Sequence, residues 1–463
     1  MNGILDYIDK FIVGYNEYIG QYLLLAFLIP TGIYFAFKFK FLHVTKFFHS
    51  LRVISGKYDN PDDVGDINHF RALTTALSAT VGTGNIVGVA LAIYYGGPGA
   101  IFWMWVTGFL GMILKFTECT LSFIYRKVHP NGSISGGPMY YMEIGLKEKL
   151  GSLAKIMAVV FAFATILCSL GTGNMAQSNS ISDVFNTNYG IPTWGTGLFI
   201  TALVLLVIVG GIKRIAQVTS KLVPFMAAMY FISAIVATIL YFDQLPAAFL
   251  LIVKSAFTGQ AATGGFIGAA FIYTLRFGVA RGLFSNEAGQ GSAAIAHAAA
   301  KTEYPVREGL VASVGPFVDT IIICSLTAMV VVVTGAWTSG VKGVGMTVEG
   351  FYRGLKPIGL GSMSQHVVAA GLVMFAFSTI ISWSYYGNRA VEYLWGEKSI
   401  LPYQWIFGVF VFLGSIWGID LVWHFVDMVI TFMTIPNLIA IVLLSSVVKR
   451  EADKYFKVMK GVI

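Results

Sequence analysis

Eleven apolar runs, each long enough to cross a bilayer as a helix, leave this chain few folds to adopt. About 20 mostly apolar residues cross the hydrocarbon core of a membrane, because an α-helix rises about 1.5 Å per residue. Only 12% of the residues are charged, whereas a soluble domain carries about 25%. We therefore expect an all-α polytopic membrane protein. Its expected spans are residues 17–37, 72–95, 98–125, 154–185, 194–211, 218–241, 264–293, 308–335, 366–388, 402–419 and 425–448.

Lysine and arginine are concentrated in alternate loops and in the C-terminal tail, which together hold 23 of the 31 basic residues. Loops of this kind stay in the cytoplasm. The N-terminus should therefore lie outside the cell membrane and the C-terminus inside. The same pattern accounts for the net charge of +8 without nucleic acid as a partner. The basic segments are residues 38–71, 126–149, 213–221, 281–307, 389–398 and 449–460.

The first span stands apart behind a long basic loop, and the remaining ten divide into two groups of five. An odd number of spans per group inverts the second group relative to the first, which is a common ground plan of secondary transporters. We expect four parts. They are residues 1–66 with the extra span and its loop, 67–241 with the first repeat, 264–448 with the second repeat, and 449–463 as a cytoplasmic tail.

The stretch TVGTGNIVG, residues 80–88, predicts a break inside the first span of the first repeat. Gly82 and Gly84 let the backbone leave helical geometry. The freed N–H groups suit a carboxylate, and the freed carbonyls suit a cation such as sodium. This span has no Asp or Glu, which favours a substrate that brings its own carboxylate, an amino acid. Packing of two helices through the glycines is the alternative reading. The polar residues of the span are Thr74, Thr75, Ser78, Thr80, Thr83 and Asn85.

A dinucleotide-binding loop would need a preceding strand and a downstream acidic residue. The residues before Gly82 form a helix-length apolar run, and the segment LAIYYGGPGAIFWMWV after it has no acidic residue. We therefore reject that reading.

Corresponding breaks are expected in the two repeats, because discontinuous helices form the binding sites of such transporters. The first span of the second repeat contains YTLRFGVARGLFSNEAGQGS, residues 273–292, with glycines and polar residues at membrane depth. A second GTGN, residues 171–174, lies near Gln177 in another span. It either lines the cavity opposite the breaks or lets two helices cross closely, and the sequence leaves both open.

Ser378 and Thr379 place two adjacent hydroxyl groups in the span VMFAFSTIISWSYYG. Hydroxyls and backbone carbonyls are hard oxygen ligands, which suit sodium rather than a transition metal. The alternative is that each hydroxyl bonds to a carbonyl of its own helix.

Two long motifs resemble the alanine or glycine:cation symporter family. They are GGPGAIFWMWVTGFLG, residues 96–111, and GLFSNEAGQGSAAIAHAAA, residues 282–300. The resemblance implies sodium-coupled uptake of small amino acids by alternating access, and the leucine-transporter (LeuT) fold of five plus five inverted helices. In that pattern an arginine of an outer ion pair stands where this chain has Gly88, so Asp427 lacks its expected partner.

The resemblance also implies which residues bind. A pocket walled by large aromatic side chains would favour glycine or alanine, including D-alanine. The expected sodium ligands are the carbonyls of Ser78, Val81 and Phe375 and the hydroxyls of Ser378 and Thr379. The expected substrate-binding residues are Thr75, Thr80, Gly82, Thr83, Gly84, Asn85, Gln177, Phe271, Tyr273, Thr274, Phe277 and Gly278.

The predicted function is sodium-coupled symport of a small neutral amino acid. A proton-coupled transporter of the same fold is the first alternative, and an ion channel is a weaker one because no filter motif is found. An enzyme is not expected, since the sequence has no H-E-x-x-H and no G-x-S-x-G motif.

Overall fold

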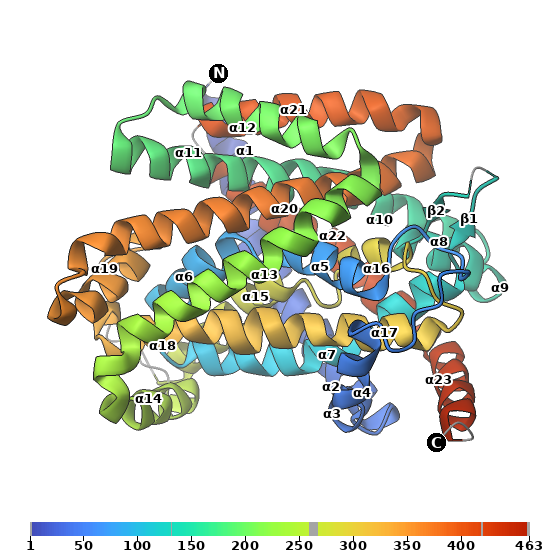
Figure 1. Cartoon of the computed structure of the whole chain (residues 1–463), viewed down its shortest axis with the longest axis horizontal. Helices are drawn as coiled ribbons and strands as arrows, with labels where there is room; N and C mark the ends of the chain where they lie inside the picture. The colour runs from blue at the N-terminus through green and yellow to red at the C-terminus, as the bar shows by residue number, and fades with distance from the viewer. Residues whose placement is uncertain (1, 131, 259–266, 418–419, 461–463) are drawn as a thin grey trace.

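The computed structural model describes residues 2–130, 132–258, 267–417 and 420–460 (Figure 1). Long helices run side by side through the body of the molecule. The helices α14 (Leu245–Thr258) and α19 (Val344–Leu355) lie at one end, and α23 (Ser445–Lys460) lies at the other. A small hairpin, β1 (Lys127–Val128) and β2 (Ile134–Ser135), lies at the same end as α23.

The N-terminal span is a nearly continuous helix that packs outside the ten core spans. It consists of α1 (Asn2–Tyr15), the π-helical turn η1 (Asn16–Gly20) and α2 (Gln21–Lys38). It packs against α22 (Asp420–Leu443) and α7 (Ala100–Ile124). The short helices α3 (Leu42–Thr45) and α4 (Phe47–Ile54) follow it.

The first five core spans begin with a helix that is bent by 54° where α5 ends. Their elements are α5 (His69–Thr80), η2 (Gly84–Gly88), α6 (Val89–Gly96), α7, α10 (Ser152–Leu170), η4 (Gly171–Met175), α11 (Ala176–Tyr189), α12 (Thr193–Ile208) and α13 (Gly211–Thr238). Short connecting elements are α8 (Pro138–Tyr140), η3 (Tyr141–Gly145), α9 (Lys147–Leu150) and η5 (Ile239–Gln244).

The second five core spans also begin with an interrupted helix, whose second piece is short. Their elements are α15 (Ile267–Asn286), α16 (Ser292–His297), α17 (Pro305–Pro316), η6 (Phe317–Cys324), α18 (Ser325–Val333), α20 (Ser364–Trp395), α21 (Ile400–Ile416) and α22. Single 3₁₀ turns occur at Ala336–Thr338, Lys356–Ile358, Gly361–Met363 and Glu397–Ser399.

Fewer helices meet the length and hydropathy expected of a membrane span than the eleven spans predicted from the sequence. Within the described residues eight helices are long and apolar enough to cross a membrane, and nine if the bent pair α5 and α6 counts as one span. Two of the expected spans do not meet these criteria of length and hydropathy. The helix α12 has only 16 residues, and the span expected at 264–293 is divided into α15 and α16 and begins outside the described residues. The class of multi-pass membrane protein is confirmed.

The broken helix lies at the centre of the packing. The helices α15 and α17 pack along α7, whereas α10, α11 and α13 pack along α20. The helix α5 contacts both α13 and α20, and η2 contacts α15 and η6. Two groups of helices therefore meet at the break between α5 and η2.

Candidate substrate and cation site

The backbone leaves helical geometry at residues 81–82, as the glycines predict. Val81 follows α5 in an extended conformation, with φ −75° and ψ 92°. A Cβ atom on Gly82 would lie 2.6 Å from the Thr379 Oγ1 atom of α20, so only glycine permits this approach. A Cβ atom on Gly84 would lie 3.1 Å from the Phe284 ring. The break is therefore enclosed by α20 on one side and α15 on the other.

The five oxygen atoms expected to hold a cation lie together at the end of α5. The Thr379 hydroxyl lies 3.1 Å from the Ser78 carbonyl oxygen, 3.3 Å from that of Val81 and 3.0 Å from that of Phe375. The Ser378 hydroxyl lies 3.2 Å from the Ser78 carbonyl and 2.9 Å from the Phe375 carbonyl. All five residues are buried. Two carbonyls that the break leaves without helical partners therefore face two hydroxyls across the contact between α5 and α20.

Asn85 connects the break to a buried carboxylate on η6, Asp319. The Asn85 Nδ2 group donates to Asp319 Oδ1 over 2.7 Å, and its Oδ1 atom accepts from the Gly82 N–H over 2.9 Å. The hydroxyls of Ser285 and Thr320 also donate to Asp319, over 2.6 and 2.8 Å. These donors are all neutral, so an ionised Asp319 would have no cationic partner among them. A charge at membrane depth needs one.

The sequence prediction missed Asp319. Its signal was present, because Asp319 is a lone carboxylate within the apolar run 308–335, apart from Glu308 at the beginning of that run. Intramembrane carboxylates are rare and mark functional sites. Asp319 is buried where helix α17 continues as a π-helical segment, η6, and such segments are frequent at functional sites.

Gln177 of α11 closes the opposite side of the break. Its Nε2 group donates to the Thr83 hydroxyl over 3.1 Å and to the Thr172 carbonyl over 3.0 Å. The Thr83 N–H donates to the Gln177 Oε1 atom over 3.3 Å. Thr172 belongs to η4, which contains the second GTGN. The structure thus brings this second motif to the break through Gln177.

The first span of the second repeat is interrupted near the end of the stretch 273–292, in which the break is expected. The helix α15 is continuous through Phe271–Gly278, and it ends at Asn286. The break falls at Glu287–Gly291, where Glu287 has φ 55°. Glu287 accepts hydrogen bonds from the Ser292 hydroxyl, over 2.5 Å, and from the Trp383 ring N–H, over 3.0 Å.

Five residues expected to bind the substrate therefore lie on a continuous part of α15, away from Gly82–Asn85. Thr274 donates to the Gly96 carbonyl at the far end of α6, over 2.7 Å. The other four are an exposed Tyr273, a Phe277 stacked on Tyr95, a Gly278 against α7, and Phe271 beside Trp103. At the level of the break, α15 presents Phe284 and Ser285 instead.

Two expected threonines on α5 bond within or beside their own helix. Thr75 donates to the Arg71 carbonyl over 2.7 Å and lies 3.3 Å from the Thr219 hydroxyl of α13. Thr80 lies within hydrogen-bonding distance of the carbonyls of Ala76 and Leu77. These two threonines are therefore tied to the helix backbone rather than directed at the break.

An ion pair lies in a cavity of about 330 Å³ on the α14 and α19 side of the break. Arg281 of α15 and Asp427 of α22 are 3.3 Å apart. Asp427 therefore has a partner, and Arg281 belongs to this cavity rather than to the basic loop at 281–307. The cavity is also lined by Val87, Leu91, Tyr95, Ser180, Asp183, Val184, Lys342, Val344, Leu372 and His424. We call this cavity the vestibule.

A buried cluster lies at the other end of α5 from the break, toward α23. The Glu308 carboxylate at the start of α17 contacts His69 of α5 by a short hydrogen bond and His297 of α16 over 2.6 Å. All three side chains are at most 1% exposed. We call His69, His297 and Glu308 the inner triad. It joins the first half of the broken helix to the elements that follow the second break.

A discontinuous helix with buried oxygen atoms gathered at its break is typical of a secondary transporter. A family model described as "Sodium:alanine symporter family" matches residues 5–462, and the chain belongs to that family. It is thus a transporter and not an enzyme.

The relatives support the same class. The sodium/alanine symporter AgcS of Methanococcus maripaludis is 41% identical over 450 residues, which are 96% of this chain and 97% of that protein. A solved Na⁺-coupled sialic acid symporter matches with a TM-score of 0.52 and 13% identity over 87% of this chain and 81% of that chain. The solved structure of MhsT with L-phenylalanine matches with a TM-score of 0.51 and 15% identity. The match covers 83% of this chain and 98% of that chain. At these identities the structures establish the leucine-transporter fold alone.

Proposed function

We propose that this chain imports a small neutral amino acid, with alanine as the first candidate and D-alanine and glycine as further ones, by coupling it to sodium entry. The cluster of five oxygens between α5 and α20 carries the proposal. Its ligands would be the carbonyls of Ser78, Val81 and Phe375 and the hydroxyls of Ser378 and Thr379, all buried. Oxygen donors without a thiolate or imidazole suit a hard cation.

The substrate would lie beside this cation, at the backbone of residues 82–85. Backbone N–H groups at the start of η2 would receive its carboxylate, in the way that helix N-termini bind anions. Phe284 lies close to Gly84, and Gln177 covers Thr83. In this proposal Phe284 and Gln177, rather than Phe271, Tyr273 and Phe277, would bound the substrate.

Asp319 would supply the negative charge of the site. It accepts hydrogen bonds from the neutral groups of Asn85, Ser285 and Thr320. A sodium ion or the ammonium group of the substrate would offset the charge of the carboxylate. A proton on the carboxylate would do the same, and this observation keeps the proton-coupled alternative as the second candidate.

The sidedness follows from the basic loops. With the N-terminus outside and the C-terminus in the cytoplasm, the vestibule opens to the outside and the inner triad lies on the cytoplasmic side. Substrate and sodium would therefore enter past Arg281 and Asp427, and they would leave after α5 and α16 separate from α17.

Uptake of labelled alanine into proteoliposomes tests the proposal. We expect accumulation driven by an inward sodium gradient and not by a proton gradient alone, with competition by glycine and D-alanine. Thr379→Ala removes the hydroxyl nearest three carbonyls and should raise the sodium concentration for half-maximal uptake about tenfold, because one buried hydrogen-bonding group contributes about 1.5 kcal/mol.

Ser384→Ala is the matched control, since Ser384 is a buried serine of the same helix whose hydroxyl, within the described structure, donates to the Ile381 carbonyl of its own helix. This variant should keep the sodium dependence of the unmodified chain. Uptake that follows a proton gradient in the absence of sodium would favour the proton-coupled alternative.

A further inference from the structure

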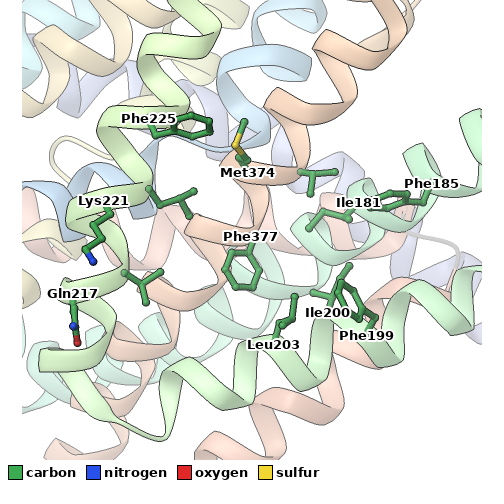
Figure 2. A pocket seen from close by; sticks show the side chains of 13 residues that line it. Ile181, Phe185, Phe199, Ile200, Leu203, Gln217, Lys221, Phe225, Met374 and Phe377 are labelled. Carbon is green, nitrogen blue, oxygen red and sulfur yellow. The ribbon is translucent and has the colours of Figure 1, made fainter.

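A groove on the membrane-facing surface lies outside the site described above. It has a volume of about 650 Å³ and is formed by α11, α12, α13 and α20. Figure 2 shows Phe377 at its centre, with Ile200 and Leu203 of α12 on one side and Gln217 and Lys221 of α13 on the other. The volume is within the range of pockets that hold small ligands, about 300–1,000 Å³.

The lining is apolar except at one place. Gln217 and Lys221 are one helical turn apart on α13 and supply its polar side chains, and no acidic residue lines the groove. The exposed fractions of Phe199 and Phe225 are 65% and 63%, so the groove is open along its length to the surrounding hydrocarbon. An occupant of this groove must therefore have a long apolar part.

The positive charge of Lys221 indicates that the occupant of the groove carries a negative charge. Lys221 lies ten residues inside α13, about 15 Å from Gly211 along the helix axis. In the described parts of the chain no carboxylate lies within ion-pair distance of Lys221. Lys221 is exposed and ends the basic segment 213–221, which is expected at the cytoplasmic edge of the membrane, where a lysine reaches toward anionic headgroups. Arg214 lies seven residues before Lys221, on the same face of α13.

We propose that this groove binds an anionic phospholipid of the leaflet at the Gly211 end of α13. One acyl chain would lie against Phe377 and Leu203, and the phosphate would meet the Lys221 ammonium and the Gln217 amide. Charge complementarity selects the phospholipid, because the one charged side chain among the described residues that line the groove is a cation, and phosphate is the anion that the membrane surface supplies. This inference does not depend on which solute the protein carries.

The test is the lipid that stays with the protein. The full chain is reconstituted in nanodiscs of phosphatidylcholine and phosphatidylglycerol, then extracted in mild detergent, and the retained lipid is quantified by mass spectrometry. We expect phosphatidylglycerol to be enriched about fivefold over the starting mixture, since one lysine near an anionic headgroup contributes about that preference.

Three variants isolate the groove. Lys221→Gln should bring the retained lipid to the composition of the starting mixture, and Lys221→Arg should keep the enrichment. Lys213→Gln is the matched control, because Lys213 is an exposed lysine of the same helix that lies outside the groove and 4.0 Å from Asp66. Leu203→Trp fills the groove at a 37% exposed position and should reduce the retained amount of both lipids.

Equal enrichment in Lys221→Gln and Lys213→Gln would overturn the proposal, as would retained lipid that matches the starting mixture in the unmodified chain. Added oleate that displaces phosphatidylglycerol completely at equal concentration would also overturn it, because the occupant would then be a fatty acid. Uptake activity does not enter any of these outcomes, so they stand whether or not the sodium proposal holds.

Discussion

At the scale of single residues, the buried carboxylate of Asp319 is the residue whose replacement should affect transport most. It is fully buried and accepts hydrogen bonds from Asn85, Ser285 and Thr320. Asp319→Asn keeps the size of the side chain and removes its charge. We expect uptake at a fixed sodium concentration to fall at least tenfold, because the bound cation loses its anion at membrane depth.

The control for this change is Asp183→Asn, in which an exposed carboxylate of the vestibule is replaced. It should retain most of the uptake. If Asp319→Asn transports at the normal rate but no longer responds to pH, the carboxylate carries a proton rather than facing a metal ion.

His43 is a second residue with a measurable consequence, this time for stability. It lies in α3 outside the spans, fully buried and edge-on to Phe109, and neither ring nitrogen has a hydrogen-bond partner in the described structure. Burial lowers the pKa of His43 from 6.5 to about 4. The unfolded chain therefore binds a proton at a higher pH than the folded chain, and stability is lost as the pH falls from 6.5 toward 4.

We expect this histidine to reduce the free energy of unfolding by about 2 kcal/mol between pH 7 and pH 5. His43→Phe keeps an aromatic ring beside Phe109 and cannot titrate. Its thermal midpoint in detergent should therefore fall less over that interval than the midpoint of the unmodified chain. An identical fall in both proteins would show that His43 is accessible to protons in the folded state.

At the scale of elements, the two breaks differ in how well the sequence predicted them. The break in the first span of the first repeat could be located within three residues, because Gly82 and Gly84 lie two positions apart in a mostly apolar helix. For the first span of the second repeat, the sequence predicts that a break occurs but not at which residues it lies. Glycines occur at 278, 282, 289 and 291, and tertiary packing decides which of them end the helix.

The structure shows why Gly278 and Gly282 stay helical. A Cβ atom at either position would collide with α7, so both serve close packing of α15 against α7. Gly289 and Gly291 have positive φ values of 87° and 82°, and they form the break. Sequence alone does not distinguish a glycine that permits close packing from one that permits a left-handed backbone, because both uses require the absence of a side chain.

The inner triad joins three elements that the sequence could not place together. His69, His297 and Glu308 belong to α5, α16 and α17. Removing one partner of a buried charged cluster costs about 3–5 kcal/mol, since the others are left unpaired. Glu308→Ala should therefore lower the thermal midpoint in detergent strongly.

Glu349→Ala is the matched control for this change. Glu349 pairs with Arg353 one helical turn away, and both are about a third exposed. Such a pair contributes about 0–1 kcal/mol, so the midpoint should hardly move. Equal shifts in the two variants would contradict a structural role of the triad.

At the scale of the whole molecule, three separate polar clusters lie among the helices: the ion pair of the vestibule, the groups around the break, and the inner triad. The sequence predicted the class, the fold, and the residues that lie around Gly82 and Thr379. It did not predict Asp319, Glu308 or the partner of Asp427, because each of these depends on contacts between residues far apart in the chain.

The vestibule carries its own prediction. Arg281 and Asp427 join α15 to α22 across it, 3.3 Å apart. Asp427→Arg should raise the alanine concentration for half-maximal uptake, because two cations would then meet at the entrance. The double variant Arg281→Asp with Asp427→Arg should restore much of the loss, and uptake kinetics in proteoliposomes would measure it. A double variant that is no better than Asp427→Arg would show that the pair itself does not control entry.

The central claim is that sodium and the amino acid occupy adjacent positions at the break and stabilise the same arrangement of helices. Equilibrium binding of labelled alanine to the purified protein, measured at increasing sodium concentrations, tests it most directly. Linkage requires that sodium strengthens alanine binding by the same factor by which alanine strengthens sodium binding. We predict this reciprocity in the unmodified chain and its loss when Ser378→Ala and Thr379→Ala are combined. Alanine binding that is unchanged without sodium, or coupling that persists in the double variant, would contradict the account.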